Sequence, residues 1–361
     1  MNVRGMVKAA AAGLCRTPGA YRVVTSVTGR SAAPLVLAYH RVVDRFEEHA
    51  RRAMPSLLVS TTMLERQLDW VGRRYRIVSL DELAAVLEAG APAAGLAAVS
   101  FDDGYQDVYH HALPLLRRKG IPGAVFVVTD LVGTRRLALH DRMYRLVTRG
   151  LARGPARGAF DWLAALGSAS SGHRDGDVRG DALVRTRQLL AALTRQQAED
   201  AAGVLEAELG LPDEDLTGML PLDWEMLGDL RRAGWTIGSH TRRHALLTRE
   251  PLLCLREELN GSRTAIERRL GAACDHFAYP DGRWNPTVVR AVAASGYRFA
   301  YSSCRHQDAM RARLTIRRTP LWERAAADGD GRFSPAVMSG LASGLFGLVG
   351  QCRLHESDPT F

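Results

Sequence analysis

Short apolar runs alternate along most of this chain with longer segments whose apolar residues recur at helical spacing. Residues 34–39 and 96–101 are largely apolar, which is typical of strands buried on both faces. Residues 62–74 instead place apolar side chains on one side of a predicted helix. The same two patterns predict further strands at 76–78, 123–128, 235–237, 277–279, 298–301 and 314–317, and further helices at 79–87, 107–119, 223–233, 251–270 and 286–295.

Local signals indicate where these elements begin and how they pair. Ser79 and Glu82 form a capping-box pattern at the start of one helix, and Gly90 ends that helix. Residues 97–128 form a strand–helix–strand pattern, which implies that the two strands pair in parallel. Repeated units of this kind predict an α/β fold of barrel type.

The alternation of strands and helices is interrupted by one long segment. Its middle, residues 167–180, is polar and rich in Gly and Ser, and helical patterns flank it at 141–151 and 185–209. We expect a mostly helical insertion here, not a second catalytic domain. The predicted organisation is a loosely structured lead-in at 1–33, an α/β domain at 34–133 plus 222–320, the insertion at 134–221, and a C-terminal tail at 321–361.

The strand predicted at 96–101 runs into two adjacent carboxylates, Asp102 and Asp103, which Gly104 follows. In α/β barrels the carboxyl ends of the strands carry the active site. Two neighbouring carboxylates are costly to keep ionised, and the cost falls if one binds a cation and the other transfers protons. A plain turn is the alternative interpretation, because Asp and Gly both favour turns.

A second candidate cluster, His240 and His244, follows the strand predicted at 235–237. In a helix, two histidines four residues apart share a face, and imidazoles so placed suit zinc and similar ions. A coincidental pair is the alternative. Together with Asp103, the two histidines would make a three-ligand site that leaves positions open for water and a substrate oxygen.

The two clusters, in this order, resemble the motifs of the polysaccharide deacetylase family, the NodB-like carbohydrate esterases. The first family motif is Thr/Ser-Phe-Asp-Asp-Gly, which corresponds to residues 100–104, and the second is His-Ser/Thr-x-x-His, which corresponds to residues 240–244. The resemblance covers roughly residues 35–133 and 222–320. It implies a distorted (β/α) barrel of about seven strands.

The resemblance also implies roles for individual residues. Asp103, His240 and His244 would hold one divalent metal ion, with zinc favoured and cobalt or nickel as alternatives. Asp102 would be the general base. The implied reaction is the metal-dependent hydrolysis of an N-acyl group, in the first place N-acetyl, on an amino sugar or glycan precursor.

Two further segments resemble a narrower branch, the circularly permuted poly-N-acetylglucosamine deacetylases of biofilms. Residues 38–42 resemble its early Tyr-His-x-Val motif, which implies His40 as the catalytic acid; a histidine held structurally at a strand end is the alternative. Residues 277–282 resemble its Phe-Ala-Tyr-Pro-x-Gly segment, whose backbone would face the oxyanion; a plain Pro-Asp-Gly turn is the alternative. Oxyanion and substrate contacts are therefore expected from Tyr279, Pro280 and Asp281.

The chain also departs from the family pattern. The better-known third motif has an arginine that restrains the catalytic aspartate, whereas Ala278 occupies that neighbourhood here, and Arg317 or Arg318 is the candidate replacement. The late Leu-x-His motif of unpermuted members is missing from residues 314–317, which supports His40 as the acid or else leaves the acid unidentified.

Several other histidines are expected to be incidental. His110 and His111 lie on a predicted helix, and His140 with Asp141 opens the insertion. Surface positions or local capping are the expected roles, although His140 and Trp162 are candidates to border a substrate groove.

Three other functions use the same residues or the same fold. An O-acetyl esterase, or a deformylase acting on a lipid-linked sugar, would share the metal chemistry, and a non-catalytic relative would bind glycan without cleaving it. Two histidines and a carboxylate also suit the Fe(II) of non-haem oxygenases. Those enzymes usually use all-β scaffolds, whereas this chain alternates strands with helices.

Charge and cysteine content narrow the choice of partner. The net charge of +9 favours an anionic partner such as phospholipid headgroups or a lipid-linked phosphate, with a merely solvated basic surface as the alternative. No basic run with interleaved aromatics is present, so we expect a carbohydrate substrate and no nucleic acid. The five cysteines are scattered without CxxC spacing, which argues against a disulfide framework and against a cysteine zinc site.

The chain termini bear on location. The first residues form a poor signal peptide, because their apolar stretch is short and rich in Ala and Gly, and no run is long enough to cross a membrane. We expect a cytoplasmic protein, with peripheral contact to the inner face of the membrane or secretion as alternatives. The uncharged residues 334–350 are expected to form a helix that packs on the domain or lies at a membrane surface.

Overall fold

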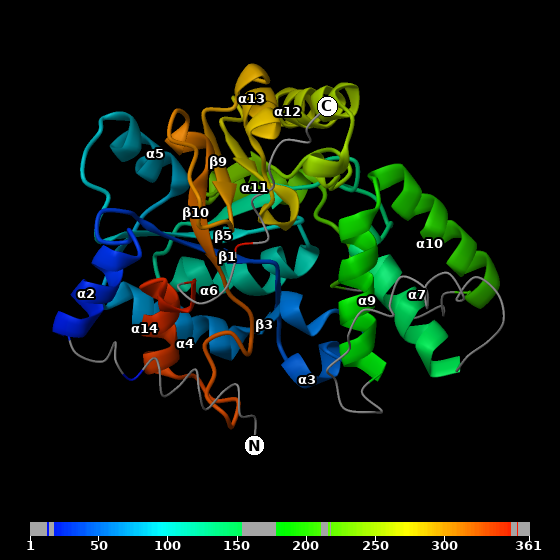
Figure 1. Cartoon of the computed structure of the whole chain (residues 1–361), viewed down its shortest axis with the longest axis horizontal. Coiled ribbons are helices and arrows are strands. Elements are labelled where there is room, and N and C mark those ends of the chain that lie inside the picture. Colours follow the sequence, from blue (N-terminus) through cyan, green and yellow to red (C-terminus); the bar gives the residue numbers. More distant parts are fainter. Residues whose placement is uncertain are drawn as a thin grey trace.

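Parallel strands close into a barrel at the centre of the computed structural model (Figure 1). This confirms the predicted barrel of about seven strands. A short additional strand, β4 (Arg76–Ile77), pairs with the first half of one barrel strand from outside the ring. The ring runs through β1 (Leu35–Tyr39), β10 (Ile316–Pro320), β9 (Phe299–Ser302), β8 (His276–Ala278), β7 (Thr236–Ser239), β6 (Ala124–Val127) and β5 (Leu96–Phe101), and β5 pairs back with β1.

The structure describes residue 13 and residues 18–153, 178–210, 216, 218–347 and 352. Within these, the barrel strands are short and apolar because helices and loops cover their outer faces while their inner side chains fill the barrel. Every residue of β1, β5 and β6 is buried. This double burial explains why their sequences are continuous apolar runs without alternation.

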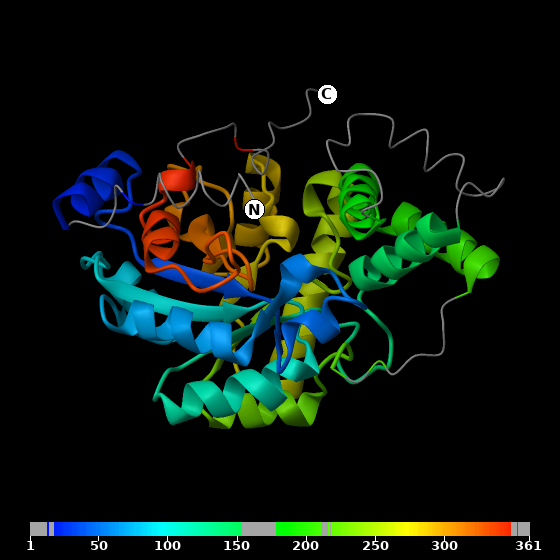
Figure 2. The same cartoon turned by 90° about the horizontal axis from the view of Figure 1, so that it is seen from below.

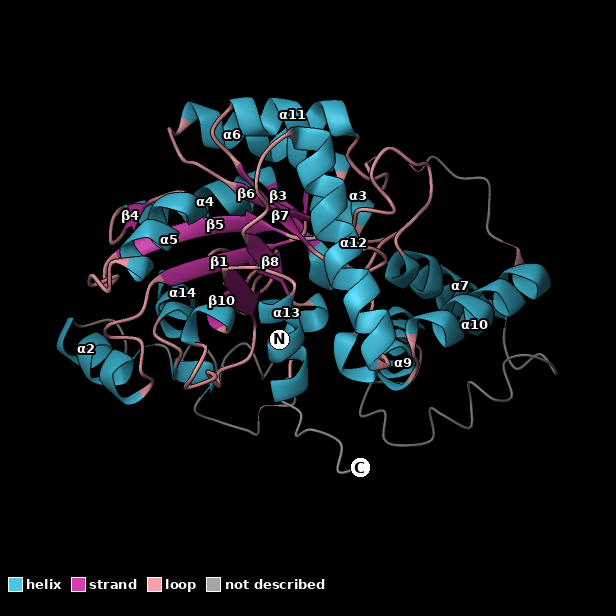
Figure 3. Cartoon of the chain, turned by 90° about the horizontal axis from the view of Figure 1, so that it is seen from above, coloured by secondary structure: helices cyan, strands magenta, loops and turns pink. Residues whose placement is uncertain are grey.

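Helices surround the barrel (Figure 3). Most of them begin at a polar residue that caps them. The side chains of Ser60, Ser79, Asp223 and Asn285 each accept the backbone N–H of the residue three positions later, which satisfies a free donor of the first turn. The helices are α4 (Thr61–Gly72), α5 (Leu80–Glu88), α6 (Leu113–Arg118), α11 (Trp224–Arg232), α12 (Leu252–Leu270) and α13 (Pro286–Ala294).

Three expectations about local structure were incomplete or wrong. The helix predicted at 107–119 begins with a π-helical turn, Val108–Ala112, and becomes α-helical only in α6. The lead-in is not loose throughout, because Pro18–Val27 forms the helix α2. Two short parallel strands, β2 (Arg41–Val43) and β3 (Leu58–Ser60), pair outside the barrel and were not predicted, because three residues carry too little periodicity to detect.

The described residues of the segment 134–221 form three helices, α7 (Leu139–Arg153), α9 (Val178–Ala192) and α10 (Arg195–Leu209). They lie together on one side of the barrel (Figures 1 and 2). Leu and Ala side chains form a separate core between them, and Met54 from the barrel domain joins that core. The helical group is therefore attached to the barrel by apolar packing on the side where β1 ends.

The C-terminal part of the described chain packs onto the barrel domain. The helix α14 (Pro335–Ala342) buries most of its side chains, and its Met338 and Ala342 belong to the main hydrophobic core. Residues 348–350 of the segment expected to be helical lie outside the described residues. Among the described residues, no helix is both long and apolar enough to cross a membrane.

A buried ion pair joins β2, just after the barrel strand β1, to the segment after β5. The Arg41 Nε donates to Asp107 Oδ2 at 2.7 Å, and both side chains are at most 2% exposed. Asp107 also accepts the backbone N–H of Val42, and Arg41 donates to the Gly218 carbonyl. These bonds tie three segments together directly behind the carboxyl end of β5.

Replacing Asp107 with Ala should lower the free energy of unfolding by about 3–5 kcal/mol, because it leaves the buried Arg41 charge without its partner. Replacing Glu48, whose ion pair with Arg45 is exposed, should cost only about 0–1 kcal/mol. Urea unfolding followed by circular dichroism measures both. If both variants lose the same free energy of unfolding, the buried ion pair stabilises the fold no more than the exposed one.

Candidate active site

Three predicted metal ligands meet at the carboxyl ends of two barrel strands. Asp103 follows β5, and His240 and His244 follow β7. The Asp103 Oδ1 lies 3.7 Å from His240 Nε2 and 3.3 Å from His244 Nε2, and one ligand atom from each residue lies within 4.8 Å of the other two. The structure thus brings together the carboxylate and both imidazoles as one cluster.

The two histidines lie on a loop and not on a helix, so helical spacing is not what brings their rings together. The segment is a tight loop in which Thr241 and His244 adopt positive φ angles of 68° and 59°. The buried Glu258 of α12 accepts the backbone N–H groups of Arg242 and Arg243 at 3.0 and 2.9 Å. This anchored loop, not helical periodicity, turns both imidazoles toward Asp103.

Hydrogen bonding and burial prepare the imidazoles to bind a cation. The His240 Nδ1 lies 2.8 Å from the Ala278 carbonyl oxygen, so it must carry the proton, and the Nε2 lone pair is left facing Asp103. Burial lowers the pKa of His240 and of His244. Both rings are therefore neutral at neutral pH, which is the form that binds metal.

Asp103 has the character of a carboxylate that needs a cation. Its Oδ1 is buried and has no hydrogen-bond partner among the described residues. Burial and the nearby carboxylates of Asp102 and Asp141 raise the pKa of Asp103 well above its usual range. An anionic Asp103 is therefore stable only with positive charge beside it, and one carboxylate with two imidazoles suits a divalent metal ion such as zinc.

Asp102 is held by an arginine from β10, which lies on the other side of β1 from β5. Arg318 on β10 donates through both terminal nitrogens to the two carboxylate oxygens, each at 2.7 Å. Burial alone would raise the pKa of Asp102, but the charges of Arg318 and His240 lower it to about 2. Of the two candidate arginines in the sequence, the structure thus places Arg318 on Asp102, while the Arg317 side chain lies against Gly344 and Gly347.

His40, the predicted general acid, lies beside the same cluster. It directly follows β1, whose last carbonyl, on Tyr39, accepts the backbone N–H of Asp102 at 2.8 Å. Burial lowers the pKa of His40 to about 4, although the Asp102 carboxylate acts in the opposite direction. His40 is therefore neutral at neutral pH in the free site.

Of the residues predicted to contact the oxyanion and substrate, Tyr279 and Pro280 pack in the protein interior and only Asp281 faces the cavity. The Tyr279 side chain is buried in the core and donates to the Leu314 carbonyl at 2.8 Å. Tyr279 and Pro280 are not among the residues that line the cavity, whereas Asp281 is, and its φ of 54° puts it in the left-handed region. The neighbouring Gly282 also has a positive φ, and a Cβ there would lie 2.7 Å from the Ser303 backbone.

These groups line one cavity of about 410 Å³. Its polar floor comes from the ends of the barrel strands, and part of its wall is apolar and comes from α9 and α10 together with Met54, Leu57 and Trp322. A wall of this mixed kind suits a ligand with both polar groups and apolar faces, as a sugar ring has. The lining includes His40, Asp102, Asp103, His140, His240, His244, Asp281, Arg318, Leu190, Leu193 and Arg195.

His140 lines the cavity, where the sequence interpretation expected a surface or capping role and gave a groove border as the alternative. Its Nε2 lies 3.6 Å from Asp103 Oδ2 and 2.6 Å from the Tyr105 hydroxyl, which donates to Asp141 at 2.6 Å. The rings of His140 and His244 are 5.1 Å apart. The adjacent His–Asp pair at the start of the insertion was the available signal. Trp162, the other candidate for the groove, lies outside the described residues.

Backbone strain is concentrated at this site. Among the described residues, the non-glycine positions with positive φ are Asp103, Thr241, His244 and Asp281. Such conformations cost of order 1–3 kcal/mol each and persist only where the surrounding structure enforces them. Two of these residues are predicted metal ligands and a third lines the cavity.

A second cluster of potential metal ligands lies away from this cavity. The sulfur atoms of Cys304 and Cys352 are 3.3 Å apart, and the His306 ring nitrogen is 3.4 Å from Cys304. The scattered positions of the cysteines in the sequence argued against a cysteine metal site. The fold nevertheless brings two of them together with a histidine.

Comparisons with known proteins agree with this geometry. In fold the chain is similar to the Streptococcus pyogenes deacetylase PplD, solved in complex with acetate, with 16% sequence identity, a TM-score of 0.50, and coverage of 81% of this chain and 93% of that one. It is also similar to IcaB from Ammonifex degensii, with 17% identity, a TM-score of 0.51, and coverage of 86% and 97%. No curated protein sequence matches the chain significantly.

The family itself follows from a sequence match. The family model for polysaccharide deacetylase matches residues 89–154 and 181–300, which together make up just over half of the chain. The matched ranges contain the two carboxylates after β5 and both histidines after β7. The chain therefore belongs to the polysaccharide deacetylase family, whose members are hydrolases of carbon–nitrogen bonds.

Proposed function

We propose that this protein removes an acyl group, in the first place N-acetyl, from an amino sugar in a glycan or glycan precursor, and that it needs a divalent metal ion to do so. One observation carries the proposal. Asp103, His240 and His244 meet around a buried, unpartnered carboxylate oxygen, and Asp102 lies beside them in the same cavity. Zinc is the favoured ion, since imidazole and carboxylate ligands in threes are typical of catalytic zinc sites.

Asp102 is proposed as the base that takes a proton from water. Its low pKa keeps it ionised at neutral pH, and the fork of Arg318 fixes the direction of its oxygens. A divalent ion at the neighbouring ligands would supply polarisation of the acyl carbonyl and a water acidic enough for so weak a base.

His40 is proposed to protonate the leaving amine. Because its imidazole is neutral in the free site, the proton must reach it during the reaction. Hydrolysis balances if the proton that Asp102 removes from water passes on through His40 to the amine nitrogen, while the hydroxide oxygen remains in the carboxylate product. The backbone near Asp281 is proposed to face the oxygen that becomes negative.

Replacing Asp102 with Asn should lower kcat by about 10²–10⁴-fold, because Asn keeps the shape of the side chain but accepts no proton. Release of acetate from N-acetyl-amino-sugar oligomers measures turnover, and metal content should stay at the wild-type level. As a control, replacing the exposed Asp200 with Asn should leave kcat unchanged. Wild-type turnover by the Asp102 variant would remove this residue from the mechanism.

Replacing His240 or His244 with Ala should remove bound metal and activity together, because each variant leaves only two of the three ligands. Elemental analysis of the purified protein measures metal per chain. The matched control is His110→Ala, since His110 is exposed and does not line the cavity. Full metal content in both variants would contradict the ligand assignment.

Replacing Arg318 with Lys should lower kcat by about 100-fold, because Lys keeps the charge but cannot hold both oxygens of Asp102 in one plane. Arg317→Lys on the same strand is the control, since its side chain points away from Asp102. Initial rates at saturating substrate test the difference. If both variants lose activity equally, strand β10 as a whole, not the fork on Asp102, is responsible.

A further inference from the structure

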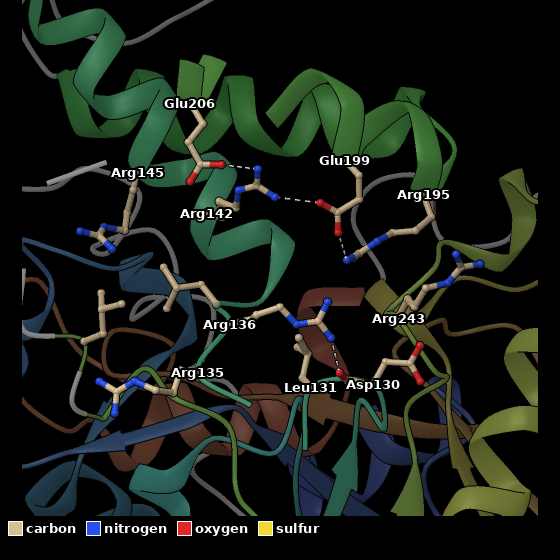
Figure 4. A pocket seen from close by; sticks show the side chains of 12 residues that line it. Asp130, Leu131, Arg135, Arg136, Arg142, Arg145, Arg195, Glu199, Glu206 and Arg243 are labelled. Atoms are coloured by element: carbon tan, nitrogen blue, oxygen red, sulfur yellow. Dashed lines mark hydrogen bonds and ion pairs between the residues drawn. The ribbon is translucent and has the colours of Figure 1, made fainter. Parts of the chain in front are cut away.

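A second cavity, of about 400 Å³, lies beside the catalytic one, between the insertion helices and the barrel (Figure 4). Arginines reach it from four segments: the chain after β6, helix α7, helix α10 and the loop after β7. We call this cavity the arginine pocket. It is lined by Asp130, Leu131, Arg135, Arg136, Leu137, Arg142, Arg145, Arg195, Glu199, Glu206, Leu216 and Arg243.

Positive charge in the arginine pocket exceeds negative charge. Six arginines line it against three carboxylates, which leaves a formal excess of three positive charges. The carboxylates are moreover already in use. Glu199 pairs with Arg142 and Arg195, and Glu206 pairs with Arg142. The Asp130 carboxylate pairs with Arg242, and Arg243 pairs with Glu258; both of these partners lie outside the lining, and counting them leaves the excess at three.

Some arginine side-chain nitrogens in the arginine pocket remain able to donate hydrogen bonds to a ligand. Among the described residues, the Arg135 side chain makes no hydrogen bond or ion pair, and the Arg136 side chain donates only to the Asp130 carbonyl oxygen. The Arg195 side chain is only 10% exposed, and its Nε is buried without a partner. Figure 4 shows the side chains of Arg136 and Arg195 pointing into the space between the helices and the barrel. A buried unpaired guanidinium nitrogen is costly, and an anion would satisfy it.

The arginine pocket adjoins the place where the chemistry occurs. Arg195 lines both this pocket and the catalytic cavity. Arg243, on another side of the pocket, directly precedes the predicted ligand His244 in the loop that Glu258 anchors. A ligand that fills the pocket therefore lies within one side chain of the catalytic cavity, and one molecule can occupy both.

We propose that the arginine pocket binds a phosphate or diphosphate group of the substrate while the N-acyl sugar attached to that group occupies the catalytic cavity. This rests on the proposed deacylation and names its substrate class: an amino sugar linked through phosphate. Guanidinium forks match phosphate oxygens in pairs, and several arginines around one cavity suit an anion of more than one charge. A single carboxylate on a sugar would compensate only one of the three excess charges.

Two kinds of molecule carry this chemistry, a nucleotide-linked sugar and a lipid-linked sugar. Both present a diphosphate next to the first sugar ring. The pocket binds this shared diphosphate and therefore does not by itself distinguish the two kinds of molecule. The two differ in the group on the far side of the diphosphate, which is a nucleoside in one and an apolar chain in the other. Substrates of both kinds therefore form separate arms of the test.

The first test measures anion binding without turnover. Calorimetric titration of the full-length protein with inorganic pyrophosphate should give binding that weakens about tenfold or more in the double variant Arg135→Gln/Arg136→Gln and weakens further as salt is raised. Both arginines are exposed, so the variant should fold normally. The control is Arg73→Gln, an exposed arginine that lines neither cavity. Because pyrophosphate also binds metal ions, the arginine dependence is the readout.

The second test compares substrates. Acetate release is followed from a neutral N-acetylated oligosaccharide, a nucleoside-diphosphate N-acetylhexosamine, and a short-chain isoprenyl-diphosphate N-acetylhexosamine in detergent. The double variant should raise KM about tenfold for the better of the two diphosphate substrates, with kcat and the neutral KM unchanged. The preferred diphosphate substrate identifies the source of the phosphate.

The outcomes separate this proposal from the one on which it rests. Pyrophosphate binding and KM values equal to those of Arg73→Gln, or a KM that rises equally for neutral and charged substrates, would overturn the phosphate assignment while deacylation stands. Arginine-dependent pyrophosphate binding without acetate release from any substrate would support the anion site and refute the proposed reaction.

Discussion

The electrostatics of two neighbouring carboxylates buried at the end of β5 govern the architecture of the site. Asp102 and Asp103 cannot both stay ionised in an apolar barrel unless each has its own positive partner. Arg318 supplies that partner for Asp102 from β10, on the other side of β1. For Asp103 the described residues supply only neutral imidazoles, those of His140, His240 and His244. In the proposed mechanism a bound cation supplies the missing charge, so that Asp102 acts as the base and Asp103 as a metal ligand.

Closure of the barrel and local strain both serve this arrangement. Closing the ring places β10 and β5 on either side of β1. As a result Arg318 and Asp102, more than 200 residues apart in the sequence, form a bidentate ion pair. The positive φ values at Asp103, His244 and Asp281 show that the loops are held in conformations which their own sequences do not favour. The apolar core and the anchoring bonds of Glu258 stabilise these loops in return.

The insertion is part of the site as well as an appendage to the barrel. Helix α7 contributes His140, whose ring lies beside Asp103 and His244, and helix α10 contributes Arg195, which stands between the catalytic cavity and the arginine pocket. The sequence interpretation gave His140 only as a candidate to border the groove and did not single out Arg195. Both residues lie outside the family motifs, and helical periodicity says nothing about which end of a helix meets the barrel. Their importance follows from packing of the helices onto the domain through a small apolar core.

Sequence alone determined the order of most strands and helices, the barrel class, and the carboxylates and histidines to which we assign the chemistry. These follow from local information: apolar runs mark buried strands, caps mark helix starts, and the carboxyl ends of parallel strands meet on one face. Tertiary structure decided that Arg318, not Arg317, holds Asp102, that residues 240–244 form a strained loop, and that His140 and Arg195 reach the cavity. It also brought Cys304 and Cys352 together. Each of these depends on contacts between residues distant in sequence, whose direction is set by barrel closure and helix docking and not by any local pattern.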